Sequence, residues 1–430
     1  MYIRSLVVLT FCFAVFGNHL APLYEVVKPI PNRYLIKVKN TGRNALSYLV
    51  DDLLAENERS AQPYPGFGHI DIIDEMDGDY LKILLVELDY KSLNTVRRHP
   101  AVEFVEEEDG RAISSEDDFD FGQFDSLGID TEEKRSQSKR LTEDDFPYNE
   151  KGFNGLDRIN QRDNELDKNI SFSGNGFGVN IYLLSTGVLQ THDDFDCRVR
   201  MAYDVMGKTG EDCAGTGTSI AGIAIGKSVG VARAAMVHSV RVHDCNSTET
   251  SARHVAGMQW VANNRAKPCV VLLTASINNG GKTIDAAAEA LVDAGCVVVA
   301  KSAPLRDSHS EKRACSFSPG RSRRVITVSG TYRNNRKADW AGDGICVDIF
   351  APGSTLMTTF PTNDGYYELA NGPNFSAAFV AGVAAIHLGN KVDAANVKTR
   401  ILNDATPCVV GNDLKGAPNR MLYVDPGPYY

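Results

Sequence analysis

The sequence lacks three features that would point to particular functions. It has no excess of positive charge, because 45 Lys and Arg stand against 55 Asp and Glu, for a formal net charge of -10. This balance disfavours a surface that binds nucleic acid or an anionic membrane. Beyond residue 17 no apolar run reaches the length of a membrane span, and no cysteine spacing matches a zinc site. We therefore expect no nucleic-acid partner, no membrane span and no metal centre of the zinc type.

The N-terminus has the features of a secretory signal. Arg4 precedes the apolar run SLVVLTFCFAVF, and the small residue Gly17 offers a cleavage point after it. A first core strand is the alternative, but so long an unbroken apolar run is not typical of a strand at a chain start. We predict a signal peptide over residues 1–17 and a secreted, extracellular protein.

Eight cysteines remain after the signal, and an oxidising compartment favours disulfides between them. They stand at positions 197, 213, 245, 269, 296, 315, 346 and 408. Two Asn-X-Ser/Thr sequons, at Asn169 and Asn246, lie in polar stretches and are predicted glycosylation sites.

Residues 29–109 have the pattern of one small α+β domain. A stripe of apolar residues between Ala45 and Leu54 predicts one helix, and residues 90–99 predict a shorter one. The alternation of apolar and acidic residues in AVEFVEEED predicts an edge strand. The other predicted strands are PNRYLIKVKN, GHIDII and YLKILLVEL. This order is the split-βαβ, ferredoxin-like plan.

Residues 110–152 are predicted to be a linker. From Glu116 to Phe146 the composition is strongly acidic and poor in aliphatic residues, which is typical of a solvated tract. The tract contains the dibasic pair Lys139-Arg140, and Lys134-Arg135 before it. Such a pair is either a processing site or a local balance of charge, and both interpretations stay open.

Residues 153–425 alternate between short β-branched runs and helical stretches. Runs that are apolar almost throughout suit strands covered on both faces. They are GVNIYLLS, AAMVHSVRV, CVVLLTAS, GCVVVAKS, RRVITVSG and CVDIFAP. The helical stretches between them predict an α/β fold, a parallel sheet with helices on both sides and a site at the carboxyl ends of its strands.

The motifs LLSTGVLQTHDDF, GTGTSIAGIAIG, VGVARAAMVHSVRV, DIFAPG and GPNFSAAFVAGVAA make the resemblance specific. In order and spacing, residues 153–425 resemble the subtilase family of serine proteases, nearest to its proteinase K and secreted convertase branches. Residues 29–109 resemble the propeptide of that family. The resemblance implies a three-layer subtilisin-like peptidase domain, a preceding inhibitor domain and descent from serine endopeptidases.

The resemblance also shows what has changed at the catalytic positions. The family uses an aspartate, a histidine and a serine as its triad. In this chain the matching positions are Ser185, Thr216 and Asn374. A hydroxyl is no base near neutral pH and an amide nitrogen is no nucleophile, so we predict an inactive site. Asn374 is expected to serve as a helix N-cap instead.

Two further parts of the site depart from the family pattern. The asparagine that stabilises the oxyanion is replaced by Pro304, or by a residue next to it. The segment that pairs with extended substrate, Ser-Leu-Gly-Gly in the family, reads Ser276, Ile277, Asn278 and Asn279. Glycines allow close backbone approach, so the two asparagines are expected to narrow the groove.

Two disulfides follow from the resemblance, Cys213 with Cys245 and Cys315 with Cys346, and the remaining four cysteines stay unassigned. An inert buried thiol is the interpretation of Cys296. Calcium is common in the family, but no ligand set is recognisable, and no other cofactor is expected.

Three hypotheses of function remain. The first is a secreted pseudoprotease that binds its own propeptide domain and a peptide, protease or receptor. The second is an active subtilisin-like endopeptidase with a non-standard triad, and the third is a structural or storage protein. A relocated triad would have to recruit Ser376 and one histidine, either His192, His243, His254 or His387.

Overall fold

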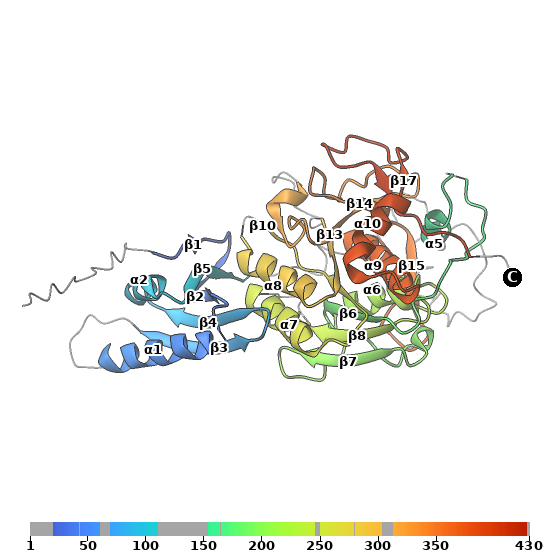
Figure 1. Ribbon diagram of the computed structural model, residues 1–430. Coiled ribbons are helices and arrows are strands. Elements are labelled where there is room, and N and C mark those ends of the chain that lie inside the picture. Colours follow the sequence, from blue (N-terminus) through green and yellow to red (C-terminus); the bar gives the residue numbers. More distant parts are fainter. Residues whose placement is uncertain are drawn as a thin grey trace, which may run out of the picture.

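The chain folds into an N-terminal and a C-terminal domain, each built on its own sheet (Figure 1). The structure is a computed structural model, and it describes residues 20–42, 44–60, 69–110, 154–163, 165–245, 250–278, 280–302 and 313–427. The predicted signal peptide and the predicted linker after residue 110 lie outside these ranges. So do Lys139, Arg140, Asn246, Asn279 and Pro304, and the side chain of Asn278 is not described.

The N-terminal domain has the predicted βαββαβ order with one short strand added. Its elements are β1 (Leu23–Tyr24), β2 (Pro29–Val38), α1 (Ala45–Ser60), β3 (Ile70–Asp77), β4 (Lys82–Leu88), α2 (Tyr90–Arg98) and β5 (Val102–Asp109). The sheet order is β1-β5-β2-β4-β3. The pairs β5-β2, β2-β4 and β4-β3 are antiparallel, and β1 pairs with β5 in parallel.

Both faces of this sheet are buried, because side chains alternate along each strand. Ile36 and Leu84 point to α1 and α2, where Leu49 and Val96 complete a small core. Leu35, Ile83 and Leu85 point the other way and share a core with Val255 and Met258 of the C-terminal domain. The second face of the N-terminal sheet is therefore covered by the other domain.

The C-terminal domain is built on a nine-stranded sheet of order β17-β18-β14-β13-β11-β9-β6-β8-β7, parallel except for β17. Its strands are β6 (Asn180–Ser185), β7 (Val199–Asp204), β8 (Met236–Arg241), β9 (Cys269–Leu273), β11 (Val297–Lys301), β13 (Ile326–Thr331), β14 (Ile349–Pro352), β17 (Thr406–Pro407) and β18 (Arg420–Met421). Two small sheets accompany it, β10 (Ile277–Asn278) with β12 (Phe317–Ser318) and β15 (Leu356–Thr359) with β16 (Tyr367–Ala370).

Helices cover both faces of the large sheet and make three layers (Figure 1). Ile181 and Leu183 of β6 share a core with α6 and α9, whereas Tyr182 and Leu184 share one with α7 and α8. The helical elements are α5 (Asn154–Ile159), η2 (Asp193–Phe195), α6 (Thr216–Ile225), α7 (Ser251–Asn264), α8 (Lys282–Asp293), η3 (Ala314–Ser316), α9 (Pro373–Gly389) and α10 (Ala394–Asp404). The predicted α/β architecture is confirmed.

One prediction about the N-terminal domain is wrong. Strand β5 is not an edge, because β1 pairs with it in parallel at Leu23 and Val105. The acidic side chains of Glu106 and Glu108, which suggested a solvent-facing strand, are each 1% exposed. They are buried because their side of β5 faces helices of the C-terminal domain.

No single helix in the described ranges is long and apolar enough to cross a membrane. Helices α9 and α10 meet a length and composition test only together, with a bend of 119° between them.

Candidate functional site

Ser185, Thr216 and Asn374 all lie at the carboxyl edge of the large sheet. Ser185 is the last residue of β6, Thr216 the first residue of α6, and Asn374 the second residue of α9. The loop after β6 touches the start of α6, where Gly217 N donates to Thr186 Oγ1 at 3.0 Å. Gly217 is required there, because a Cβ would stand 1.8 Å from the Gly187 carbonyl oxygen.

Buried neutral groups occupy these three positions. Ser185 is fully buried, Thr216 is 5% exposed and Asn374 is 1% exposed. Within the described part of the chain, the Ser185 hydroxyl has no hydrogen-bond partner. None of the three side chains can act as a base near neutral pH or carry the negative charge that stabilises an imidazolium.

Asp212 is the carboxylate beside this site, and sequence analysis missed it. Its Oδ1 accepts from Thr186 Oγ1 at 2.8 Å and from Gly215 N at 2.9 Å. Its Oδ2 accepts from Thr218 N at 2.8 Å and Thr218 Oγ1 at 2.6 Å. The carboxylate is therefore committed to holding the start of α6. Its position just before the GTGT stretch at a helix start was the available signal.

The prediction that Asn374 is a helix N-cap is wrong. The N-cap of α9 is Gly372, with φ 145°, and Pro373 is the first residue of the helix. Asn374 Oδ1 and Nδ2 are both buried, and neither has a hydrogen-bond partner among the described residues. A carboxamide with a donor and an acceptor unpaired in the interior costs stability, so capping does not account for this residue.

Other buried hydroxyls accompany it on the neighbouring segments. Ser276 and Ser302 are 3% and 0% exposed, and the described residues provide no partner for either hydroxyl. Ile277 is buried in β10 and pairs with Ser318 of β12. The predicted narrowing of the groove concerns side chains of Asn278 and Asn279, which lie outside the described set, as does the Pro304 position.

The residues needed for a relocated triad are engaged elsewhere. The Ser376 hydroxyl donates to the Pro352 carbonyl at 3.1 Å. His192 Nε2 lies 2.8 Å from the Tyr366 carbonyl oxygen, and His243 Nε2 lies 3.0 Å from His254 Nε2. His387 faces Asp404 at 3.8 Å, and burial holds its pKa below the usual value.

Three disulfides stabilise the C-terminal domain. Cys213 is joined to Cys245 and Cys315 to Cys346, as the resemblance implied. The third joins Cys269 to Cys296, so the interpretation of Cys296 as a buried thiol is wrong. Cys197 and Cys408 are free and exposed.

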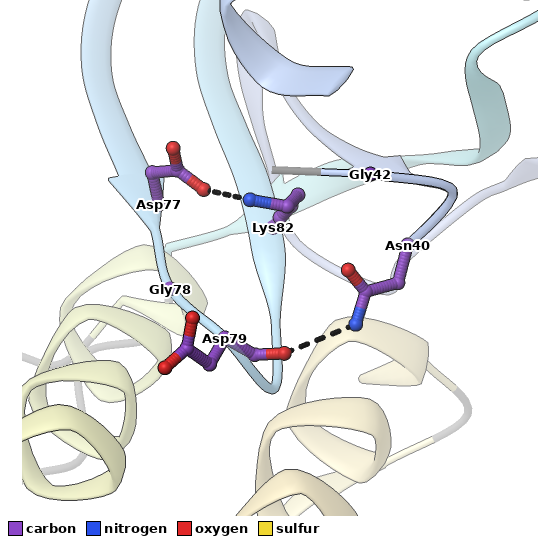
Figure 2. Close-up of a pocket in the computed structure, with 6 residues that line it drawn as sticks. All are labelled: Asn40, Gly42, Asp77, Gly78, Asp79 and Lys82. Carbon is purple, nitrogen blue, oxygen red and sulfur yellow. Dashed lines mark hydrogen bonds and ion pairs between the residues drawn. The ribbon is translucent and has the colours of Figure 1, made fainter. Parts of the chain in front are cut away.

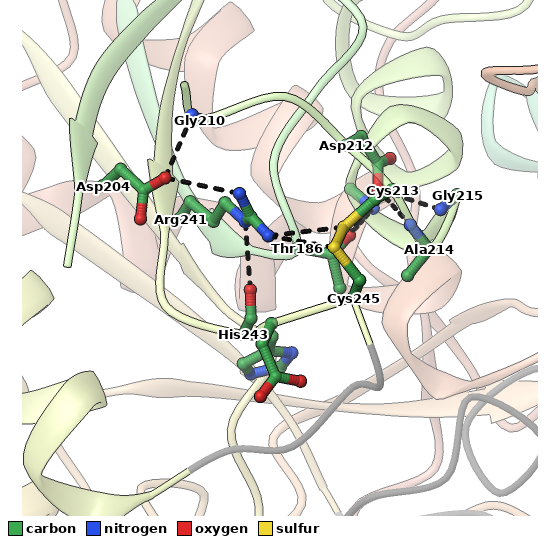
Figure 3. The surroundings of a disulfide bond; sticks show 12 residues. Thr186, Asp204, Gly210, Asp212, Cys213, Ala214, Gly215, Arg241, His243 and Cys245 are labelled. Atoms are coloured by element: carbon green, nitrogen blue, oxygen red, sulfur yellow. Dashed lines mark hydrogen bonds and ion pairs between the residues drawn. A yellow bond between two sulfur atoms is a disulfide. The ribbon is translucent and has the colours of Figure 1, made fainter. Parts of the chain in front are cut away.

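The first of these disulfides lies next to a buried guanidinium (Figure 3). Arg241 Nη2 is 3.3 Å from Cys213 Sγ and 3.4 Å from Cys245 Sγ. Arg241 Nη1 lies 3.4 Å from Asp204 Oδ2, with both side chains 3% exposed. This ion pair and disulfide tie the end of β8 to the loop before α6.

Two acidic residues of β5 connect the N-terminal domain to helix starts of the C-terminal domain. Glu106 accepts hydrogen bonds from Lys282 N at 2.7 Å and Thr283 N at 2.8 Å at the start of α8. Glu108 faces Thr250, the N-cap of α7, and pairs with Arg33 at 2.9 Å. Burial raises the pKa of Glu108. Carboxylates are favourable at helix N-termini.

The turn between β3 and β4 completes this interface. Gly78 packs so closely on α7 that a Cβ would stand 2.0 Å from Gln259 Nε2. Figure 2 shows the hollow beside this turn, where Lys82 pairs with Asp77 and Asn40 Nδ2 donates to the Asp79 carbonyl. These polar contacts lie within the N-terminal domain and shape the turn.

No metal site is assigned. The described residues contain no group of three or more His, Cys, Asp or Glu that could hold a metal ion. Calcium takes six to eight oxygen ligands, usually including several carboxylates. The buried Asp157, with Oδ1 unpaired among described residues, does not make such a set by itself.

Comparison with known proteins agrees with this fold. Residues 176–421 match the model of the subtilase family, peptidase S8, over more than half of the chain. The chain therefore belongs to the subtilase family of serine proteases.

Among its relatives is the extracellular serine proteinase of Thermus sp. (strain Rt41A), 34% identical over 274 residues, which are 63% of this chain and 65% of that protein. Alkaline serine exoprotease A of Vibrio alginolyticus is 34% identical over 275 residues, which are 63% of this chain and 49% of that protein. The chain thus spans less than two thirds of either relative. The crystal structure of a cold adapted subtilisin-like serine proteinase is matched with a TM-score of 0.59 and 30% identity, over 64% of this chain and 99% of that one.

Proposed function

We propose that this chain is a secreted subtilase homologue that binds peptides or proteins and does not hydrolyse them. The observation that supports this most is the chemistry of the three triad positions. Ser185, Thr216 and Asn374 are buried; none of them is a base that could activate a hydroxyl, and the position of the family's nucleophile carries an amide. The secreted relatives and the three disulfides favour an extracellular location.

Asn374 is suited to binding in a way that a catalytic serine is not. Its carboxamide carries one acceptor and two donors, which match the C=O and N–H of a peptide group. Both ends are buried and unpaired among the described residues. A bound extended segment, or a side-chain amide of a partner, would satisfy them once the groups that cover Asn374 move aside. An unpaired buried carboxamide has a use in a binding site, whereas a storage protein has no use for one.

The N-terminal domain is proposed to be a propeptide that remains on the C-terminal domain. Glu106 and Glu108 hold it on α8 and α7, and Leu35, Ile83 and Leu85 bury their side chains in the shared core. A chain without its own nucleophile cannot release this domain by self-cleavage. Release would require another protease, for which Lys139-Arg140 is the proposed site.

A fluorophosphonate probe for serine hydrolases tests the proposal. We expect the purified full chain to remain unlabelled under conditions in which an active subtilase reacts stoichiometrically. Stoichiometric labelling of the wild-type chain would contradict the proposal. The variant S376A then serves as the matched control, because loss of label in S376A would identify Ser376 as a displaced nucleophile and establish the endopeptidase hypothesis.

A further inference from the structure

A small hollow opens where two neighbouring parallel strands of the large sheet end. Thr331 and Pro352, the last residues of β13 and β14, line it together with Arg158, Arg333 and Ser354. The enclosed space measures about 20 Å³, which is room for one species little larger than a water molecule. The carboxyl edge of an open α/β sheet is where ligands bind. We call this hollow the Arg158 pocket.

Arg158 lies in this pocket without a direct ion-pair partner among the described residues. The residue is 5% exposed, and its Nε donates to Asn335 Oδ1 at 2.8 Å while its Nη1 donates to the Gln161 carbonyl at 2.9 Å. Both acceptors are neutral. Its Nη2 is buried, and no hydrogen-bond partner for it occurs among the described residues. A buried guanidinium without a carboxylate partner is costly unless an anion reaches it.

The charges around the pocket favour an anion. Arg333 adds a second arginine to the lining, and Ser354 lines it as well. Burial lowers the pKa of Arg158, and the charge of Asp163 opposes this effect. Asp157, next in sequence, accepts from Lys168 N at 3.0 Å and forms no ion pair with Arg158 among the described residues.

We propose that the Arg158 pocket binds a small monovalent anion, either a halide or a carboxylate group. The Nη2 of Arg158 donates to the anion, and Arg333 attracts it at the mouth. The size of the hollow and the planar donor face of a guanidinium suit a chloride ion or a carboxylate head. No acid on α5, β13 or β14 that the structure describes forms an ion pair with Arg158.

The pocket is coupled to the first turn of α9. Pro352 lines the pocket, and its carbonyl accepts the hydroxyl of Ser376, two residues after Asn374. An anion that holds Arg158 and the end of β14 in place therefore also supports the segment that bears Asn374. The pocket is a second binding site, separate from the triad positions.

Thermal unfolding of the full chain in different sodium salts tests the proposal. Chloride or formate replaces gluconate at constant ionic strength, because gluconate carries the same carboxylate on a body too large for the hollow. We expect a rise in Tm of about 2 °C once the small anion exceeds its Kd roughly tenfold. A response to chloride identifies a halide site, and a response to formate alone identifies a carboxylate site.

Two matched variants locate the effect. Asn335→Asp places a carboxylate within 2.8 Å of Arg158 Nε, so this variant should have the anion-saturated Tm in every salt. Asn412→Asp is the control, because Asn412 likewise has a positive φ and accepts from an arginine Nε, that of the exposed Arg336, at 3.0 Å. This control should respond to anions as the wild type does.

Three outcomes would overturn the proposal. A wild-type Tm that is the same in chloride, formate and gluconate would mean that water alone fills the pocket. An equal rise in all salts relative to low ionic strength would mean general screening of surface charge. An Asn335→Asp variant that still responds like the wild type would place the anion elsewhere on the molecule.

Discussion

Glu106 of the N-terminal domain caps a helix of the C-terminal domain through Thr283. One carboxylate oxygen, Oε2, accepts both the backbone N–H of Thr283 at 2.8 Å and its hydroxyl at 2.6 Å. The other oxygen accepts from Lys282 N. A single buried side chain thus satisfies three donors at the start of α8, across the boundary between the two domains.

Replacing Glu106 should weaken this boundary measurably. In Glu106→Gln only one oxygen remains, and the amide nitrogen faces an N–H donor. We expect the free energy of unfolding to fall by about 2–3 kcal/mol in urea denaturation. Glu87→Gln, which changes an exposed residue of β4, is the control and should leave it within about 0.5 kcal/mol. Equal losses in both variants would show that the helix cap contributes nothing specific.

Asn374 should behave as a residue that lowers stability. Removing a buried amide with both ends unpaired is expected to leave stability unchanged or raise it by about 1 kcal/mol in Asn374→Ala. Ser376→Ala on the same helix should lower it by about 1 kcal/mol, because the hydroxyl is bonded to Pro352. Denaturant unfolding of the two variants checks this contrast. A loss above about 2 kcal/mol in Asn374→Ala would mean that its amide is paired within the chain.

Asp157 gives stability a defined pH dependence. Burial, the largest cause, raises its folded-state pKa from 3.8 to about 6, so the folded state binds more protons than the unfolded state between these values. Its contribution to stability is therefore greatest below about pH 4, falls as the pH rises through 6, and is level above. Asp157→Asn should be about 1–2 kcal/mol more stable than the wild type at pH 7 and equal to it near pH 4. Asp71→Asn, an exposed change on β3, corrects for the loss of a surface charge.

The cysteine pairing predicts a thiol count. A chain that begins after residue 17 should show two reactive thiols without denaturation, from Cys197 and Cys408. Replacing Cys269 and Cys296 by alanine should lower the free energy of unfolding by more than the typical 2–4 kcal/mol, because both side chains are buried. The exposed pair Cys213 and Cys245 closes a loop of similar length and is the control, with a smaller loss expected. Four thiols counted after denaturation without a reductant would contradict the assigned third disulfide.

The strands of the large sheet could be predicted because their sequence pattern is set by burial on both faces. Ile181 to Leu184 are apolar without interruption since helices cover each side of β6. The order of the strands in space could not be predicted in this way. Cys269 and Cys296 meet because β9 and β11 are neighbours, and their own stretch of sequence contains no sign of that.

Two local errors have equally physical causes. The acidic residues of β5 have the alternation of a solvent-facing strand, but helix N-termini from another domain lie where water was expected. The predicted N-cap, Asn374, lies two positions after the true N-cap, because Gly372 and Pro373 begin the helix without a capping side chain. The first error is decided by a tertiary contact, and the second by the local backbone at Gly372 and Pro373.

The shared core beneath the N-terminal sheet has a consequence for how the chain comes apart. Leu35, Ile83 and Leu85 are in one apolar cluster with Val255 and Met258, so separating the domains would expose both faces to water at once. Because one chain carries both domains, redocking after such an opening is a unimolecular step at a high effective concentration. A soluble protein that binds the same face of the C-terminal domain would therefore have to compete with an N-terminal domain that is covalently linked to it.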